Sequence, residues 1–289
     1  SVIVQLDIYS NRPQQLAQSP SFVVTKLLAP LVRRGIDIKI RANPRTDNFP
    51  AVSLMHVDLT QLPSHFATLH RHHQHCLNGH VHSIAKPRYS SLAVGVDQRA
   101  YRGPVIVKTR LNHRGLPELR ARVRRGEFGP DEQLNWPQLV ATYAPPYQVF
   151  ADVEQVPKTV WGNPRLFVER FAPGSLQLPV VKYRYNFFLN QSFTTRAVFN
   201  SLLCEADSLL ELHFIQQSAP ELLAIREKMQ LDFGAIDYFV TASGVAIIDV
   251  NKTAVLQQGW VEEYRPVANF IDGAAAAVAE LAKTAAIGR

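Results

Sequence analysis

The sequence has few cysteines and no long apolar or basic runs. Cys76 and Cys204 are the only cysteines in 289 residues, which excludes a disulfide framework and a paired-cysteine zinc motif. No apolar run approaches the roughly 20 residues that span a bilayer. The first residues also lack the basic and apolar segments of a signal peptide. We therefore expect a cytoplasmic protein that does not enter a membrane, with both cysteines as small core residues.

Charged residues are scarce as well, at 19% of the chain, while apolar residues make up 46%. This composition excludes a disordered chain and allows more than one hydrophobic core. The net charge is nevertheless +7, which favours anionic partners. Arg120, Arg122, Arg124 and Arg125 form the densest basic stretch, but aromatic residues are not interleaved with it. We interpret it as a solvated helix face or a loop facing an anion, and expect no nucleic-acid partner.

The first third of the chain alternates between strand and helix patterns. Apolar and β-branched residues predict strands over residues 2–8, 36–40, 51–57 and 76–77. Helical spacing predicts helices over residues 21–34 and 63–73, the first ended by Gly35. The alternation predicts an α/β layer with a mainly parallel sheet.

The rest of the chain predicts antiparallel strands. Residues 103–108 and 166–168 are strand-like, and the Pro-rich stretch 126–164 between them is expected to be irregular. A hairpin is expected from residues 186–189 and 196–199, with its turn about residues 191–192. A helix over residues 219–230, strands over 235–240 and 245–250, and an Ala-rich helix over 267–286 follow.

Three oxygen-bearing side chains gather in the last predicted hairpin. Asp237 and Asp249 lie on strands expected to pair, so they can approach each other. Asn251 lies two residues beyond Asp249, so both side chains share one face of the strand. Oxygen ligands of this kind suit a hard cation such as Mg²⁺. A solvent-facing Asp at a strand end is the alternative for either residue alone.

Lys108 and Glu169 each end an apolar strand. Lys108 follows Val105, Ile106 and Val107, where its ammonium could reach phosphate oxygens. The loop after it, residues 109–115, could cover phosphates with backbone N–H groups. Glu169 could hydrogen-bond a flat base. Taken singly, Lys108 is more often a solvated strand end, and an ordinary surface position is the alternative for Glu169.

The order of these residues resembles the ATP-grasp superfamily, which includes D-alanine–D-alanine ligase, glutathione synthetase and ribosomal-protein glutamate ligases. The resemblance begins at Lys86 and runs to the C-terminus, and its most specific parts are residues 234–237 and 248–253. It implies an α/β (α+β) fold in three parts. These are an N-terminal parallel-sheet domain at 1–85, a small ATP-grasp lobe at 86–171 and a C-terminal lobe at 172–289.

The resemblance also implies roles for individual residues. Its phosphate-binding lysines would be Lys86 and Lys108, its adenine hinge Glu169, Arg170 and Phe171, and its magnesium ligands Asp237, Asp249 and Asn251. Many members carry an Arg where this chain has Ala235. Arg196 or Lys252 would then supply the basic catalytic group, with Arg184 and Arg196 as further candidates for phosphate or substrate contact.

The implied cofactors are ATP and Mg²⁺, and the implied activity is carboxylate–amine or carboxylate–thiol ligation. The substrates would be a small-molecule or peptide carboxylate and an amine or thiol co-substrate. A small-molecule kinase and a nucleotide-binding module without turnover remain alternatives. A homodimer is a further expectation, since many members of the superfamily are dimers.

A histidine-rich segment precedes Lys86. Its histidines surround Cys76 and are His70, His72, His73, His75, His80 and His82. They suggest zinc, but no pair has convincing ligand spacing. We favour a half-exposed helix end followed by a turn at Asn78 and Gly79.

Overall fold

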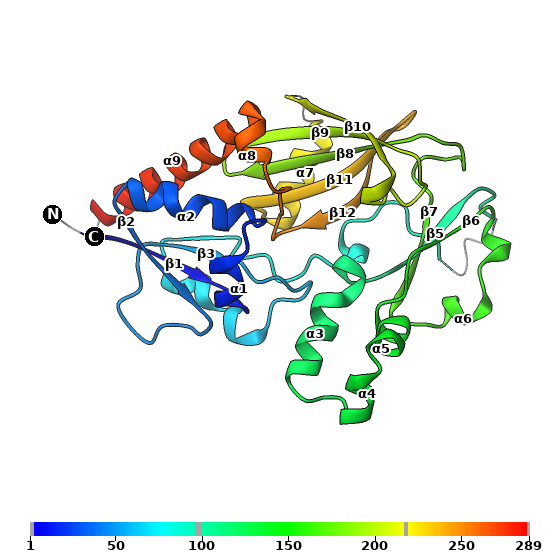
Figure 1. The fold of residues 1–289 in the computed structure, drawn as a ribbon, viewed down its shortest axis with the longest axis horizontal. Coiled ribbons are helices and arrows are strands. Elements are labelled where there is room, and N and C mark those ends of the chain that lie inside the picture. Colours follow the sequence, from blue (N-terminus) through cyan, green and yellow to red (C-terminus); the bar gives the residue numbers. More distant parts are fainter. Residues whose placement is uncertain (1–2, 96–99, 217–218, 288–289) are drawn as a thin grey trace.

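The structure is a computed structural model, and it describes residues 3–95, 100–216 and 219–287. Its strands form three sheets of four, five and three strands. Figure 1 shows the four-stranded sheet at the N-terminal end of the molecule and the three-stranded sheet at the far end. The five-stranded sheet lies along the top of this view.

The N-terminal sheet is fully parallel, as predicted, with strand order β2-β1-β3-β4. Its strands are β1 (Val4–Tyr9), β2 (Ile36–Arg41), β3 (Val52–Met55) and β4 (His75–Leu77), and its helices are α1 (Pro13–Gln18) and α2 (Val23–Arg33). Residue 2 of the first predicted strand lies outside the described residues. The predicted helix over 63–73 is wrong. Two short 3₁₀ turns form instead, Ser64–Phe66 and Leu69–His72, since no side chain caps them and histidine is a poor helix former.

The three-stranded sheet is antiparallel and has the order β6-β5-β7. It consists of β5 (Val105–Thr109), β6 (Gln148–Phe150) and β7 (Leu166–Arg170), and the helices around it are α3 (Leu116–Arg124), α4 (Pro130–Leu134), α5 (Trp136–Tyr143) and α6 (Lys158–Trp161). The expectation of an irregular segment over 126–164 is therefore wrong. A proline stands in the first turn of α3, α4 and α5, where its missing N–H costs no helical hydrogen bond.

The five-stranded sheet is antiparallel, with order β10-β9-β8-β11-β12. Its strands are β8 (Val180–Phe188), β9 (Gln191–Phe199), β10 (Leu209–Ile215), β11 (Phe233–Thr241) and β12 (Gly244–Asn251), and its helices are α7 (Pro220–Met229), α8 (Trp260–Glu263) and α9 (Arg265–Ile287). The β8–β9 turn falls at Leu189 and Asn190, two residues earlier than expected. Strand β10 was not predicted from the sequence; it is an edge strand with no buried side chain.

Helix α9 joins the first and last thirds of the chain in one hydrophobic core. Its buried face includes Phe270, Ala274 and Val278, which pack in the same cluster as Leu27 of α2 and Phe193 of β9. Small alanines allow the close approach of α9 to α2 seen in Figure 1. The proposed boundaries at 85/86 and 171/172 remain predictions. No helix within the described ranges is long and apolar enough to cross a membrane.

Candidate functional site

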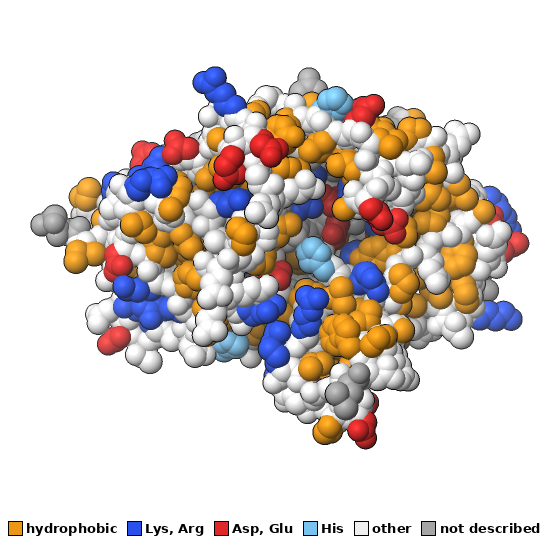
Figure 2. All heavy atoms as spheres, viewed as in Figure 1, with side chains coloured by type: hydrophobic (Ala, Val, Ile, Leu, Met, Phe, Trp, Pro, Cys, Tyr) orange, Lys and Arg blue, Asp and Glu red, His pale blue; other side chains and the backbone are white. Residues whose placement is uncertain are grey.

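A cavity of about 170 Å³ lies between the three-stranded and five-stranded sheets. Figure 2 shows the molecule hollowed in this region. Seven residues predicted for the site line the cavity, namely Lys86, Lys108, Glu169, Arg170, Phe171, Asp237 and Asp249. Apolar Ile106, Phe239 and Ile248 line it as well. Residues of β5, β7, β11 and β12, together with Lys86, thus meet at one site.

Asp237 and Asp249 are directly opposite each other on β11 and β12. The ladder shifts its register just after Asp237, so the strands bend at this point. Arg184 Nη1 contacts both oxygens of Asp237, at 3.1 and 3.2 Å. The Tyr89 hydroxyl donates to Oδ1 of Asp249 at 3.2 Å. The two carboxylates are therefore close together and held by different partners.

Cations keep Asp237 ionised despite its burial. Burial alone would raise the pKa of this carboxyl, but Arg184 and Lys182 outweigh it and lower the pKa below its ordinary value. Lys182 Nζ lies 3.9 Å from Oδ2 of Asp237. An ionised carboxylate of this kind is available to a metal ion.

Lys86 is almost fully buried, with 1% of its side chain exposed. Its Nζ donates to the carbonyl oxygen of Leu111 at 2.8 Å and lies 3.8 Å from Oδ1 of Asp249. Burial would lower the pKa of Lys86, but Asp249 and Tyr147 outweigh it and raise the pKa. Lys86 therefore places a fixed positive charge beside the acidic pair.

Lys108 and Glu169 form a buried ion pair across β5 and β7. Lys108 Nζ lies 2.6 Å from Glu169 Oε2 and donates to the carbonyl oxygen of Ile248 at 3.2 Å. Glu169 is fully buried, and its Oε1 has no hydrogen-bond partner among the described residues. An unsatisfied buried oxygen is costly, so Oε1 is suited to accept an N–H from a bound ligand.

Backbone N–H groups of the predicted hinge already donate hydrogen bonds within the protein. The N–H of Arg170 donates to Leu92 and that of Phe171 donates to Pro104, both at 2.8 Å. Ala172 also lines the cavity, and its N–H has no partner within the described part of the chain. The structure therefore offers Ala172 as the hinge donor, a residue that the sequence analysis did not select.

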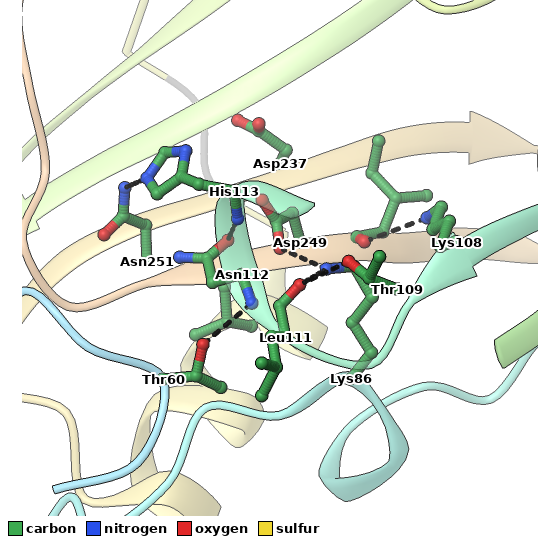
Figure 3. A network of polar contacts seen from close by, with 12 residues as sticks. Thr60, Lys86, Lys108, Thr109, Leu111, Asn112, His113, Asp237, Asp249 and Asn251 are labelled. Carbon is green, nitrogen blue, oxygen red and sulfur yellow. Dashed lines mark hydrogen bonds and ion pairs between the residues drawn. The ribbon is translucent and has the colours of Figure 1, made fainter. Parts of the chain in front are cut away.

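The loop after β5 connects the site to the N-terminal domain. His113 and Arg114 adopt left-handed backbone conformations, with φ of 46° and 61°, which are costly for residues other than glycine. The N–H of Asn112 donates to Thr60 Oγ1 at 2.8 Å. Figure 3 shows the His113 ring turned toward Asn251, whose Nδ2 lies 3.4 Å from His113 Nε2.

The donor set fits Mg²⁺. Asp237 and Asp249 supply carboxylate oxygens. Asn251 Oδ1 accepts the N–H of Thr253 at 2.8 Å and lies 3.2 Å from Thr253 Oγ1. The Thr253 hydroxyl has one proton, and it donates this proton to Asp58 Oδ1 in the shorter hydrogen bond of 2.7 Å. Asn251 Oδ1 thus keeps a lone pair, but Asn251 is not among the residues that line the cavity with Asp237 and Asp249.

The structure does not bring Arg196 to the cavity. Arg196 pairs across strands with Tyr183, whereas Arg184 pairs with Thr195, so the two arginines lie on opposite faces of the sheet. The nearest acid to Arg196 is Glu211, at 4.0 Å. Arg184, by contrast, lies on the face of Asp237 and contacts its carboxylate.

Lys252 is also absent from the cavity lining. It is buried, and its Nζ has no hydrogen-bond partner among the described residues. Burial lowers the pKa of Lys252 to about 8, although Glu118 and Asp58 act in the opposite direction. Lys252 therefore lies near Asp58, which follows β3, and near Glu118 of α3.

The histidines do not form a metal site. The His70 ring lies 4.3 Å from that of His80, but His72 stacks on Phe49 and His73 bonds the Tyr9 hydroxyl at 3.1 Å. Across the described residues, no group of three or more His, Cys, Asp or Glu side chains is arranged to hold a metal ion. Of the two cysteines, Cys204 lines the cavity and both are half-buried.

Two further residues of the site, Tyr89 and Lys182, were not predicted from the sequence. Tyr89 lies three residues after Lys86 and carried no recognisable motif. Lys182 could have been identified from the sequence, because it lies two residues before Arg184 on the same strand. Residues two apart on a strand share one face of the sheet.

No protein-family profile and no curated protein sequence matches the chain. The chain is similar to the solved structure of the ATP-grasp ligase PsnB complexed with a minimal precursor. The TM-score is 0.53 at 10% identity, over 96% of this chain and 99% of that one. The chain is also similar to D-alanine–D-alanine ligase from Bacillus anthracis, with a TM-score of 0.46 at 11% identity over 96% of this chain and 99% of that one. It is likewise similar to a RimK domain protein from Sphaerobacter thermophilus, with a TM-score of 0.46 at 11% identity over 94% of this chain and 99% of that one. The chain has the ATP-grasp fold, which confirms the fold expectation.

Proposed function

We propose that this protein is a ligase that uses ATP and Mg²⁺ to activate a carboxylate for attack by an amine or thiol. The observation that supports it best is the meeting of Lys86, Lys108, Asp237 and Asp249 in one cavity. Two buried lysines beside two carboxylates suit phosphates that arrive with a divalent cation.

Each part of the cavity has a task in this proposal. The apolar side chains of Ile106, Phe239 and Ile248 would enclose the base, while Glu169 Oε1 accepts and the Ala172 N–H donates a hydrogen bond to its edge. Lys86 and Lys108 would neutralise phosphate oxygens. Mg²⁺ held by Asp237, Asp249 and Asn251 would supply further neutralisation of the phosphate charge.

The reaction needs no protein nucleophile. A carboxylate oxygen of the substrate attacks the γ-phosphorus, the bond between that phosphorus and the β–γ bridging oxygen breaks, and ADP leaves. The amine or thiol then attacks the carbonyl carbon of the acyl phosphate, and phosphate leaves. Arg184, which contacts Asp237, would stabilise negative charge on the transferring group. Catalysis would rest on positioning and electrostatics.

Hydroxylamine trapping tests this reaction. ADP formation is measured with amino acids, dicarboxylates and glutamate peptides, using hydroxylamine as the acceptor and Asp249→Asn as the control. A ligase forms hydroxamate in proportion to ADP, and the variant forms neither. A stable phosphorylated product without hydroxamate identifies a kinase and contradicts the proposal. Equal ADP formation by both proteins also contradicts it.

A further inference from the structure

A second, larger hollow of about 600 Å³ lies outside the nucleotide cavity, between α1 and α3. Its lining includes Arg12 and Arg124 and the amide side chains of Asn11, Gln14, Gln15 and Gln18. We call it the α1–α3 hollow. Figure 2 shows Lys and Arg side chains gathered in the region that lies between α1 and α3 in Figure 1.

The two arginines of this hollow lack acidic partners. No carboxylate of the described residues pairs with Arg12 or Arg124, whereas the neighbouring Arg122 and Arg125 both bind Glu127. Burial and the nearby Arg12 lower the pKa of Arg124, which shows that the two positive charges act on each other. Uncompensated like charges around a hollow attract an anion.

The other lining groups indicate what kind of anion this is. Amide side chains both donate and accept hydrogen bonds, as a peptide backbone does. No aromatic side chain is among the residues lining the hollow, so it lacks the stacking platforms that bind single-stranded nucleic acid. Carboxylates match guanidinium groups with two parallel hydrogen bonds. These features favour a peptide that carries acidic side chains.

A chain of hydrogen bonds links the hollow to the proposed metal site. Asn11 Oδ1 accepts the N–H of Asp58 at 2.9 Å, and Asp58 Oδ1 accepts the Thr253 hydroxyl at 2.7 Å. The Thr253 N–H donates to Asn251 Oδ1 at 2.8 Å. The wall of the hollow is therefore fixed relative to Asn251.

We propose that the α1–α3 hollow binds an acidic peptide, and that this peptide supplies the carboxylate substrate. The second part rests on the proposed ligase function. Arg12 and Arg124 would bind acidic side chains, and the glutamine amides would bind the peptide backbone.

Fluorescence anisotropy with fluorescein-labelled octaglutamate tests the binding without any nucleotide. We compare the wild type, the Arg12→Ala/Arg124→Ala double variant and a control that also loses two charges, Arg33→Ala/Arg71→Ala. Both control residues are exposed, and neither lines the hollow. We expect the Kd to rise about tenfold in the double variant, as for loss of two charge-assisted contacts, and at most about twofold in the control.

Equal weakening in both variants would show unspecific charge attraction and overturn the proposal. Tighter binding of a labelled single-stranded RNA octamer, lost in the Arg12/Arg124 variant, would assign the hollow to nucleic acid and also overturn it. Mg·ATP binding is measured on the same proteins and should not change in the double variant. Loss of peptide binding with intact Mg·ATP binding therefore separates this inference from the proposed ligase function.

Discussion

Asp237 and Asp249 face each other across β11 and β12, and each carboxylate has its own cation. Arg184 lies 3.1 Å from Asp237, and Lys86 lies 3.8 Å from Asp249. Two carboxylates this close together repel each other unless positive charge lies nearby. Protein cations therefore balance the charge of the two carboxylates, which agrees with the metal-binding role that we propose for them.

The Lys108–Glu169 pair gives the first prediction. Lys108→Met leaves Glu169 buried without its cation, so we expect a loss of about 3 kcal/mol in unfolding free energy. The Lys108→Met/Glu169→Gln double variant removes both charges and should recover most of that loss. Urea unfolding measures both effects.

ATP affinity should behave differently in these variants. Both lack the Lys108 ammonium, so calorimetry should give an ATP Kd at least about tenfold weaker than that of the wild type. A double variant that is stable and binds ATP like the wild type would remove Lys108 from the phosphate site.

Arg184 and Arg196 provide a matched comparison, because they lie on neighbouring strands but on opposite faces of the sheet. Arg184→Ala should lower the rate of ADP formation about 100-fold, as for loss of one group that stabilises transition-state charge. Arg196→Ala should change the rate no more than about twofold. The reverse result would return the catalytic role to Arg196.

His56 should make stability depend on pH. The residue is buried, its ring nitrogens have no hydrogen-bond partner among the described residues, and burial lowers its pKa to about 4. The unfolded chain binds this proton near pH 6.5, so unfolding free energy should fall by about 3 kcal/mol as pH drops from about 6.5 to 4. Above that window His56 is neutral in both states and contributes no pH dependence.

The His56→Phe variant should lack this part of the pH dependence, which urea unfolding at several pH values can measure. His65→Phe, at an exposed position, is the control and should keep the wild-type slope. Parallel curves for the wild type and His56→Phe would contradict the assignment.

The proximity of Asp237 and Asp249 could be predicted from the sequence, because the short turn between β11 and β12 makes these strands pair. The opposite faces of Arg184 and Arg196 follow from the position of the β8–β9 turn. With a two-residue loop at Leu189 and Asn190, even-numbered residues of β8 pair with odd-numbered residues of β9, so Arg184 and Arg196 must face opposite sides. An apolar pattern identifies a strand but not the position of its turn, and the turn sets the register.

Other features depend on tertiary structure alone. The occupied hinge N–H groups, those of Arg170 and Phe171, depend on where the chain segments around Leu92 and Pro104 pass, because these segments supply the accepting carbonyls. The α1–α3 hollow arises because Arg124, at the end of α3, lies beside α1, and no local pattern encodes that proximity. The helices between residues 126 and 164 were hidden by prolines that actually begin them.

The central claim is that Asp237 and Asp249 bind a metal ion together with ATP. Isothermal titration calorimetry of ATP, with and without Mg²⁺, on the wild type and on Asp249→Asn tests it most directly. We predict that Mg²⁺ tightens ATP binding to the wild type at least about tenfold, and that Asp249→Asn, which keeps the shape of the side chain, loses this gain. ATP affinity that ignores Mg²⁺ in the wild type, or a Mg²⁺ effect that persists in the variant, would contradict the account.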